Sequence, residues 1–142
     1  MPIRRASAAW DGGLKGGSGT VKAETGTVSG SYSFLSRFES GSGTNPEELL
    51  AAAHAACYAM AFSAGLEKAG KSGTSVKTDA AATIEKVGEG FKVTKMHLTV
   101  RAKVPGIGND EFQTLAAAAR DGCPISGVMK GNVEVTLDAQ LT

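Results

Sequence analysis

One long helical segment constrains the fold of this chain more than any other feature. Residues 45–48 combine an Asn that can cap a helix, a Pro suited to the first helical position and two Glu that complement the helix dipole. Residues 49–68 are all compatible with a helix except Gly65, and Gly70 can end it. The segment is rich in alanine and nearly apolar all round, which predicts burial on most sides. A chain of 142 residues offers little to cover it, which indicates a dimer.

Shorter elements are expected on both sides of this helix. The expected elements are strands at residues 4–11, 17–23 and 30–34, a hairpin of residues 75–87 and 90–104, helices from 109 or 110 to 120 and from 124 to 130, and a last strand through residues 133–137. The apolar alternation shifts near Thr94, which predicts a bulge in the hairpin. The order predicts a single α+β domain over residues 1–142, with helices on one face of antiparallel sheets.

Composition argues against two classes of partner. Fifteen Lys and Arg oppose 14 Asp and Glu, and no basic cluster of the kind that binds nucleic acid is seen. We expect no apolar stretch to approach the ~18 residues of a membrane span. The first five residues lack the apolar core of a secretory signal. We therefore expect a cytoplasmic protein with no nucleic-acid or membrane partner.

The two cysteines are the first candidates for chemistry. Cys57 lies in the middle of the long helix, and Cys123 occupies a predicted helix N-cap, where unpaired backbone amides favour a thiolate. In the cytosol a cysteine pair is more often catalytic or redox-sensing than a structural disulfide. Both can equally be small buried side chains. They are 66 positions apart, so only the fold can bring them together.

Two histidines and an arginine leave further alternatives open. His54 shares a helix face with Cys57, which keeps a Cys-His acyltransferase or hydrolase as an alternative, although no third orienting residue is evident. His97 is expected to be an ordinary strand residue. Closely spaced ligand pairs are absent from the sequence, so we expect no metal site and no cofactor. Arg37 alone would be read as a solvated loop residue.

Three blocks of sequence resemble one known family. Residues 44–57 read Thr-Asn-Pro-Glu-Glu-Leu-Leu-Ala-Ala-Ala-His-Ala-Ala-Cys, residues 122–126 read Gly-Cys-Pro-Ile-Ser, and residues 36–39 read Ser-Arg-Phe-Glu. They resemble the osmotically inducible protein C (OsmC) family and its sister group of organic hydroperoxide resistance proteins, with OsmC proper favoured. The resemblance covers essentially the whole chain. It implies an OsmC-like fold, with antiparallel sheets around a long central helix and an intertwined homodimer.

The resemblance also implies a thiol-dependent peroxidase acting in oxidative or osmotic stress. Cys57 would attack an organic hydroperoxide, Cys123 would form a disulfide with it, and an external dithiol, of lipoyl type in this family, would reduce the disulfide. Arg37 would stabilise the Cys57 thiolate, and Glu47 would hold Arg37 in place.

The spacing of these residues raises a geometric question. Glu47 and Cys57 are ten residues apart, which is ~15 Å along a helix. Either the helix is broken near its start, or Arg37 and Glu47 act on Cys57 of the partner subunit, with an apolar substrate pocket at the interface. A non-catalytic lipid- or stress-binding dimer remains the alternative outside enzymes.

Overall fold

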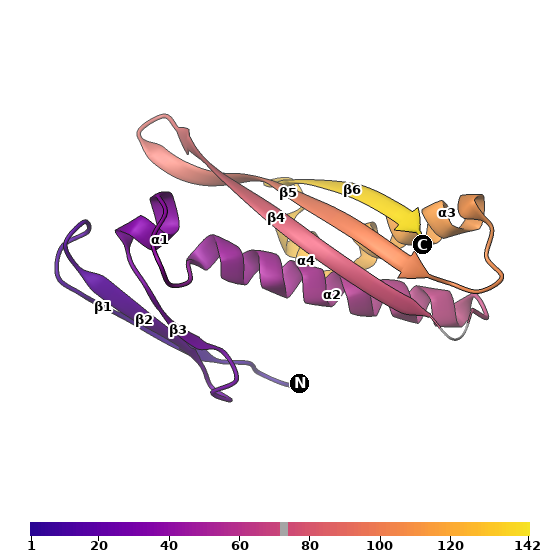
Figure 1. Ribbon diagram of the computed structural model, residues 1–142, viewed down its shortest axis with the longest axis horizontal. Helices are drawn as coiled ribbons and strands as arrows, with labels where there is room; N and C mark the ends of the chain where they lie inside the picture. The colour runs from indigo at the N-terminus through magenta and orange to yellow at the C-terminus, as the bar shows by residue number, and fades with distance from the viewer. Residues whose placement is uncertain (72–73) are drawn as a thin grey trace. The chain divides into compact units, whose positions relative to one another are not determined.

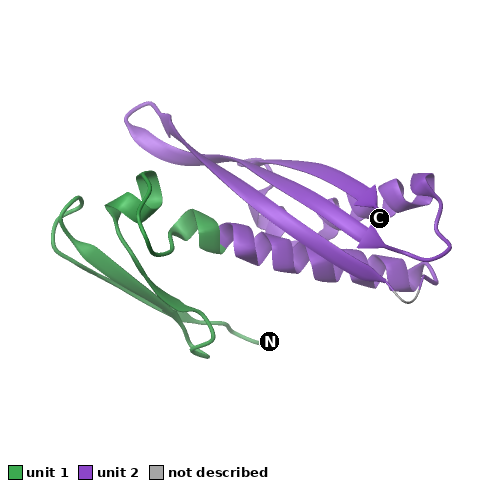
Figure 2. Cartoon of the chain, viewed as in Figure 1, with its two compact units in different colours: residues 1–49 green, residues 50–142 purple. Residues whose placement is uncertain are grey.

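The computed structural model describes residues 1–71 and 74–142, which fall into two compact units, Met1–Leu49 and Leu50–Thr142 (Figure 2). The elements, labelled in Figure 1, are β1 (Ala6–Asp11), β2 (Ser18–Ala23), β3 (Ser29–Tyr32), α1 (Phe34–Phe38), α2 (Pro46–Lys68), β4 (Ser75–Val87), β5 (Gly90–Lys103), α3 (Asn109–Gly122), α4 (Pro124–Met129) and β6 (Glu134–Leu141). The α+β class and the long helix are as predicted. The single domain over residues 1–142 stays a prediction.

The first unit contains an antiparallel sheet in the order β1-β2-β3. Gly19 on the central strand pairs with Trp10 on one side and Tyr32 on the other. A Cβ at Gly19 would lie 2.6 Å from the Tyr32 ring and 2.7 Å from the Trp10 ring, so a side chain there would displace both. The glycine therefore allows the two rings to pack against each other over the sheet, with centroids 5.3 Å apart.

A short helix replaces the end of the third predicted strand. The strand was expected to reach Phe34, but β3 ends at Tyr32 and α1 begins at Phe34. The cause is a reciprocal capping box, in which the backbone amide of Ser36 donates to Ser33 Oγ and the amide of Ser33 donates to Ser36 Oγ. Arg37 is therefore a helical residue, and the loop position expected for it is wrong.

The second unit contains a sheet in the order β4-β5-β6. The hairpin β4–β5 is antiparallel, and its register shifts where Thr83 pairs with Lys95 but Ile84 pairs with Val93. Thr94 is the extra residue, so the predicted bulge is confirmed. The strand β6 runs parallel to β5 and not antiparallel. The reason is that α3 and α4 carry the chain back toward the end of the sheet where β5 begins, before β6 starts (Figure 1).

The ends of α2 follow the sequence signals. The amide of Glu48 donates to Asn45 Oδ1 at 2.7 Å, which is the predicted N-cap. At the other end Gly70 has a φ of +76°, and the amide of Lys71 donates to the carbonyl of Leu66 at 2.9 Å. This bonding pattern with a left-handed glycine is the predicted C-terminal cap. The helix extends from Pro46 to Lys68 as one element.

Within this chain α2 is buried along one stripe only. Residues spaced four apart are fully buried and belong to the core: His54, Tyr58, Phe62 and Leu66. On other sides the helix is open, and Met60 is 77% exposed. The single chain therefore covers one face of α2 only, in keeping with the expectation that it can hardly cover the helix alone, and burial of the other sides stays a prediction.

The length and hydropathy of α2 would also allow it to cross a membrane, contrary to the expectation that no segment would qualify. Its buried stripe packs against the core of the second unit: the Phe62 ring lies 5.3 Å from that of Phe112 on α3. The Tyr58 hydroxyl donates to the carbonyl of Ala116 at 2.9 Å. These contacts make the buried stripe of α2 part of the core of the second unit.

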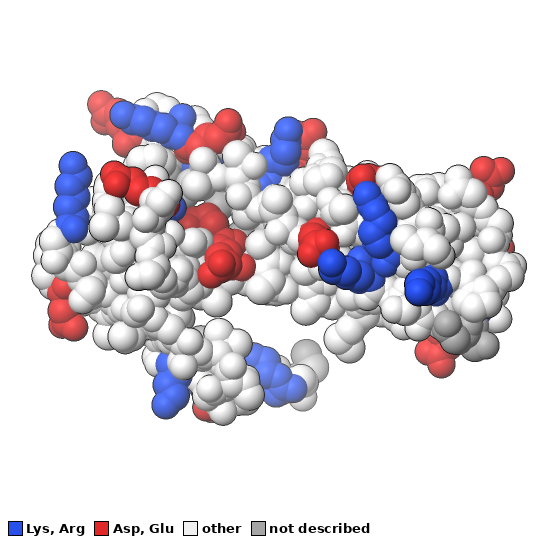
Figure 3. All heavy atoms as spheres, in the orientation of Figure 1, with Lys and Arg blue, Asp and Glu red and all other residues white. Residues whose placement is uncertain are grey.

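Charges of both signs are mixed on the face drawn in Figure 3. The sequence as a whole is nearly balanced, with 15 basic and 14 acidic residues. The expected absence of a nucleic-acid partner stays a prediction.

Candidate active site

The fold brings the two cysteines into contact. The Cys123 thiol donates to Cys57 Sγ at 2.8 Å, although the residues are 66 positions apart. Cys57 lies on α2 and is half-buried, whereas Cys123 is 1% exposed. Cys123 is the N-cap of α4, as predicted, but its side chain makes no capping hydrogen bond and faces Cys57 instead. Both are free thiols, so the site is a reduced dithiol.

Electrostatics within the second unit work against ionisation of Cys57. Burial and the hydrogen bond with Cys123 raise its pKa, whereas a hydrogen bond from the backbone amide of Ile125 lowers it. Burial is the largest of these effects, so the net direction is upward. A nearby positive charge would favour the Cys57 thiolate.

Arg37 and Glu47 form an ion pair in the first unit. Arg37 Nη2 donates to Glu47 Oε1 at 2.8 Å, and Arg37 Nε lies 3.3 Å from both carboxylate oxygens. Glu47 is 8% exposed, while the Arg37 side chain is 37% exposed. The guanidinium also lies 5.1 Å from the Phe38 ring centroid. Arg37 is thus held by a buried carboxylate and an aromatic face and is not freely solvated.

Polar contacts fix α1, and with it Arg37, to the start of α2. Ser36 Oγ donates to the carbonyl of Thr44 at 2.8 Å, and Asn45 Nδ2 donates to the carbonyl of Ser36 at 3.0 Å. Asn45 therefore has two roles, because it caps α2 and anchors α1. These contacts explain how a five-residue helix, too short to be stable alone, is formed at this position.

A mostly apolar pocket lies beside Arg37 in the first unit. It has a volume of about 260 Å³ and is lined by Trp10, Leu14, Tyr32, Ser33, Phe34, Arg37 and Phe38. Aromatic rings dominate its wall, and Arg37 supplies a positive charge at its edge. Such a pocket suits the apolar part of a small molecule that also carries a polar or anionic group.

The candidate site residues are therefore found as two pairs. Arg37 and Glu47 are paired in the first unit, and Cys57 and Cys123 are paired in the second. The catalytic roles expected for these four residues stay predictions.

His54 does not contact Cys57 in the way that a Cys-His nucleophile requires. Its Nε2 lies 2.7 Å from Ser126 Oγ, and both residues are buried. Its Nδ1 is buried without a hydrogen-bond partner among residues 1–71 and 74–142. Ser126 was not predicted as a functional residue, although it lies three residues after Cys123, just as His54 lies three residues before Cys57. This matching spacing brings His54 to Ser126 and Cys57 to Cys123 only because α4 lies against α2 in the folded chain.

His97 is the ordinary strand residue expected from its position on β5. Its Nδ1 lies 2.6 Å from Thr136 Oγ1 on the neighbouring strand β6. In the part of the chain that the structure describes, no group of three His, Cys, Asp or Glu side chains is placed to hold a metal ion.

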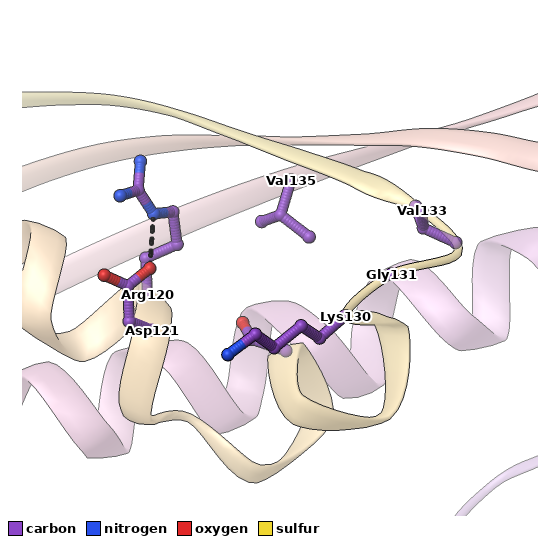
Figure 4. A pocket seen from close by; sticks show the side chains of 7 residues that line it. Arg120, Asp121, Lys130, Gly131, Val133 and Val135 are labelled. Atoms are coloured by element: carbon purple, nitrogen blue, oxygen red, sulfur yellow. Dashed lines mark hydrogen bonds and ion pairs between the residues drawn. The ribbon is translucent and has the colours of Figure 1, made fainter.

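A second hollow, which Ser126 helps to line, lies between the end of α3, helix α4 and the start of β6 (Figure 4). It has a volume of about 520 Å³ and is lined by Arg120, Asp121, Ser126, Lys130, Gly131, Val133 and Val135. Arg120 Nε donates to Asp121 Oδ1 at 3.0 Å, the contact drawn as a dashed line. Neither cysteine lines this hollow.

The burial of His54 predicts acid sensitivity of the fold. Burial lowers the pKa of His54, so the unfolded chain binds a proton more readily than the folded one. The stability due to neutral His54 is present above the unfolded pKa of about 6.5 and is lost as the pH falls below it. We expect the free energy of unfolding to decrease there by up to about 1.4 kcal/mol per pH unit.

Urea unfolding at a series of pH values, on wild type and on a His54→Gln variant, measures this effect. The difference between the two proteins isolates His54 from the carboxylates, which titrate at lower pH. Parallel pH dependences for the two proteins would show that His54 is not the source.

Comparison with known proteins gives a consistent result. The model of the family described as OsmC-like protein matches residues 39–138. The chain is 45% identical over 139 residues to Peroxiredoxin OsmC of Escherichia coli strain K12, covering 97% of this chain and 96% of that protein. It is 39% identical over 99 residues to the organic hydroperoxide resistance protein of Xanthomonas axonopodis pv. citri, covering 68% and 67%.

A solved structure shares the fold over nearly the full length. The crystal structure of an organic hydroperoxide resistance protein OsmC from Legionella pneumophila superposes with a TM-score of 0.71 at 25% identity, covering 99% of both chains.

Proposed function

The chain belongs to the OsmC-like protein family, and on that premise we propose that it is a cysteine-based peroxidase that reduces organic hydroperoxides to alcohols. The observation that carries the proposal is the contact between two free thiols, Cys57 and Cys123, at 2.8 Å. Two thiols at this distance can pass between a dithiol and a disulfide with little movement of the backbone. The names of the relatives supply the substrate class.

The chemistry follows from the different settings of the two thiols. The half-buried Cys57 thiolate attacks the terminal peroxide oxygen, so that an S–O bond forms, the O–O bond breaks and the alkoxide takes up a proton to leave as an alcohol. The buried Cys123 thiol then attacks the Cys57 sulfenic acid. The S–S bond forms, the S–O bond breaks and water leaves. An external dithiol reduces the disulfide, and we propose one of lipoyl type.

Arg37 and Glu47 are proposed to supply such a positive charge. The pKa of Cys57 is raised by burial, and a guanidinium, which stays charged at working pH, can offset that effect. Glu47 holds the guanidinium through three hydrogen bonds. Since α2 is one helix from Pro46, the separation of ten positions from Glu47 to Cys57 corresponds to ~15 Å. We therefore propose that Arg37 acts on Cys57 of the partner subunit.

The proposed enzyme is a cytoplasmic homodimer with an apolar substrate site. The exposed apolar side of α2, including Met60, supports association with a second copy. The aromatic pocket next to Arg37 supports organic peroxides over hydrogen peroxide, because it can bury an alkyl group. Nothing in the site favours the hydrolase alternative, since His54 bonds to Ser126. No observation favours a non-catalytic binding dimer.

A single titration tests the function. One equivalent of an alkyl hydroperoxide should remove both free thiols of the reduced protein and form an intramolecular Cys57–Cys123 bond, because the sulfur atoms already lie 2.8 Å apart. Peptide mapping by mass spectrometry identifies the bond, and size-exclusion chromatography should show the same non-covalent dimer before and after oxidation. Two outcomes would contradict the proposal: unchanged free thiols, or a disulfide-linked dimer on a non-reducing gel.

A further inference from the structure

A buried hydrogen bond joins α2 to α4 one turn away from the thiol contact. His54 Nε2 and Ser126 Oγ lie 2.7 Å apart; His54 is 0% exposed and Ser126 is 6% exposed. His54 lies three residues before Cys57, and residues three apart are neighbours on a helix surface. Ser126 likewise lies three residues after Cys123. The hydrogen bond and the thiol contact therefore tie together the same two segments at adjacent turns.

The placement of α4 determines two contacts of Cys57. Cys123 stands at the N-cap of α4, and the backbone amide of Ile125 hydrogen-bonds to Cys57. Because the Cys123 side chain makes no hydrogen bond to the backbone of its own helix, no local cap holds that thiol in place. With only six residues, α4 depends on its neighbours for its position. A polar contact between α2 and α4 therefore helps to place the Cys123 thiol and the Ile125 amide next to Cys57.

Stability alone is a weak reason for this contact. His54 Nδ1 is buried and lacks a partner among the described residues, and an unsatisfied buried polar group costs about 1–3 kcal/mol. An apolar side chain of similar volume would avoid that cost. What an apolar side chain cannot provide is a directional bond that fixes α4 against α2 at the level of Ser126.

We propose that His54 and Ser126 are positioning residues for the disulfide-forming step, a role that rests on the peroxidase function proposed above. Their hydrogen bond holds Cys123 Sγ in line with Cys57, so that the thiol attacks the sulfenic acid as soon as it forms. Neither residue touches the peroxide. When the bond is removed, α4 shifts, and a displacement of about 1 Å costs on the order of 10²-fold in rate.

The test separates the two chemical steps in a single turnover of the full-length protein. Reduced Ser126→Ala is mixed with one equivalent of an alkyl hydroperoxide and quenched with acid at increasing times. We expect disulfide formation to slow by about 10- to 100-fold. Consumption of the peroxide, which belongs to the first step, should change little. A cyclic 1,3-diketone, which reacts with sulfenic acids, should label Cys57 in Ser126→Ala far more than in wild type.

Two matched variants distinguish positioning from a general loss of stability. Ser126→Thr keeps the hydroxyl, and the hollow of about 520 Å³ beside Ser126 leaves space for the added methyl group, so it should restore fast disulfide formation. Tyr58→Phe removes a buried hydrogen bond from the residue after Cys57, but that bond leads to Ala116 on α3 and not to α4. Tyr58→Phe should lose stability, measured by thermal unfolding, and form the disulfide as fast as wild type.

The results for the variants test the positioning role of His54 and Ser126, and the result for wild type tests the peroxidase function. Disulfide formation at the wild-type rate in Ser126→Ala would overturn the positioning role, as would equal slowing by Tyr58→Phe. His54→Gln is the second variant and decides the matter if Ser126→Ala does not fold, because it disturbs the same bond from α2. If wild type itself does not consume the peroxide, the peroxidase function fails.

Discussion

Replacing Cys57 by serine is expected to abolish the reduction of organic hydroperoxides, a loss on the order of 10⁴-fold or more. A serine hydroxyl has nearly the same size but is not ionised at neutral pH, so the variant keeps the packing of α2 and loses the nucleophile. Cys57 is also the more accessible of the two thiols, since Cys123 is 1% exposed. Peroxide consumption at fixed protein concentration measures the effect.

The matched control for this variant is Cys123→Ser. It should still allow one oxidation of Cys57, which then stops at the sulfenic acid or proceeds to the sulfinic acid because no second thiol is in contact. Intact-mass measurement after one equivalent of peroxide distinguishes these products. Oxidation of Cys123 before Cys57 in the wild type would reverse the two assignments.

Replacing Arg37 by alanine is expected to have the second-largest effect. If Arg37 lowers the pKa of Cys57 as proposed, its removal leaves the upward effect of burial unopposed, and the pKa should rise. An opposite charge at close range changes the thiolate fraction of such a group by about 10- to 1,000-fold, so peroxide attack at neutral pH should slow within that range. The pH dependence of thiol alkylation in the reduced Cys123→Ser background gives the Cys57 titration directly.

Two further variants define the role of Arg37. Glu47→Ala should be milder, because Glu47 orients the guanidinium and does not meet the peroxide, and the double variant should resemble Arg37→Ala alone. Arg5→Ala is the matched control, since Arg5 is an exposed arginine of the same unit, 3.9 Å from Glu24. An unchanged Cys57 titration in Arg37→Ala would remove the electrostatic basis of the site.

The sequence predicted best where local signals agree with the fold. The caps at Asn45 and Gly70, the hairpin and its bulge at Thr94 are all set by residues close in sequence. The helix α1 was missed because Ser33 and Ser36 form a capping box at the end of a strand pattern. Its stability also depends on the contact from Asn45, nine residues further on, which no local pattern reveals.

Contacts between residues far apart in the sequence could not be predicted from local sequence patterns. The parallel pairing of β6 depends on how far α3 and α4 carry the chain back, not on the alternation within β6 itself. The contact between the cysteines was only implied by family resemblance. Ser126 was missed because a serine near a helix start has an ordinary explanation as a local polar residue, and only tertiary packing brings it to His54.

The separation of the two cysteines in the chain has a consequence for folding thermodynamics. A Cys57–Cys123 bond would span 66 positions, and closing a loop of that length in the unfolded chain lowers its entropy by an amount worth about 4 kcal/mol in the chain-entropy description. The oxidised protein would then resist unfolding more than the reduced one. By the same thermodynamic cycle, folding makes the disulfide harder to reduce by an equal free energy. In the proposed cycle, the reductant would therefore have to work against part of the conformational stability of the protein each time it reduces the disulfide.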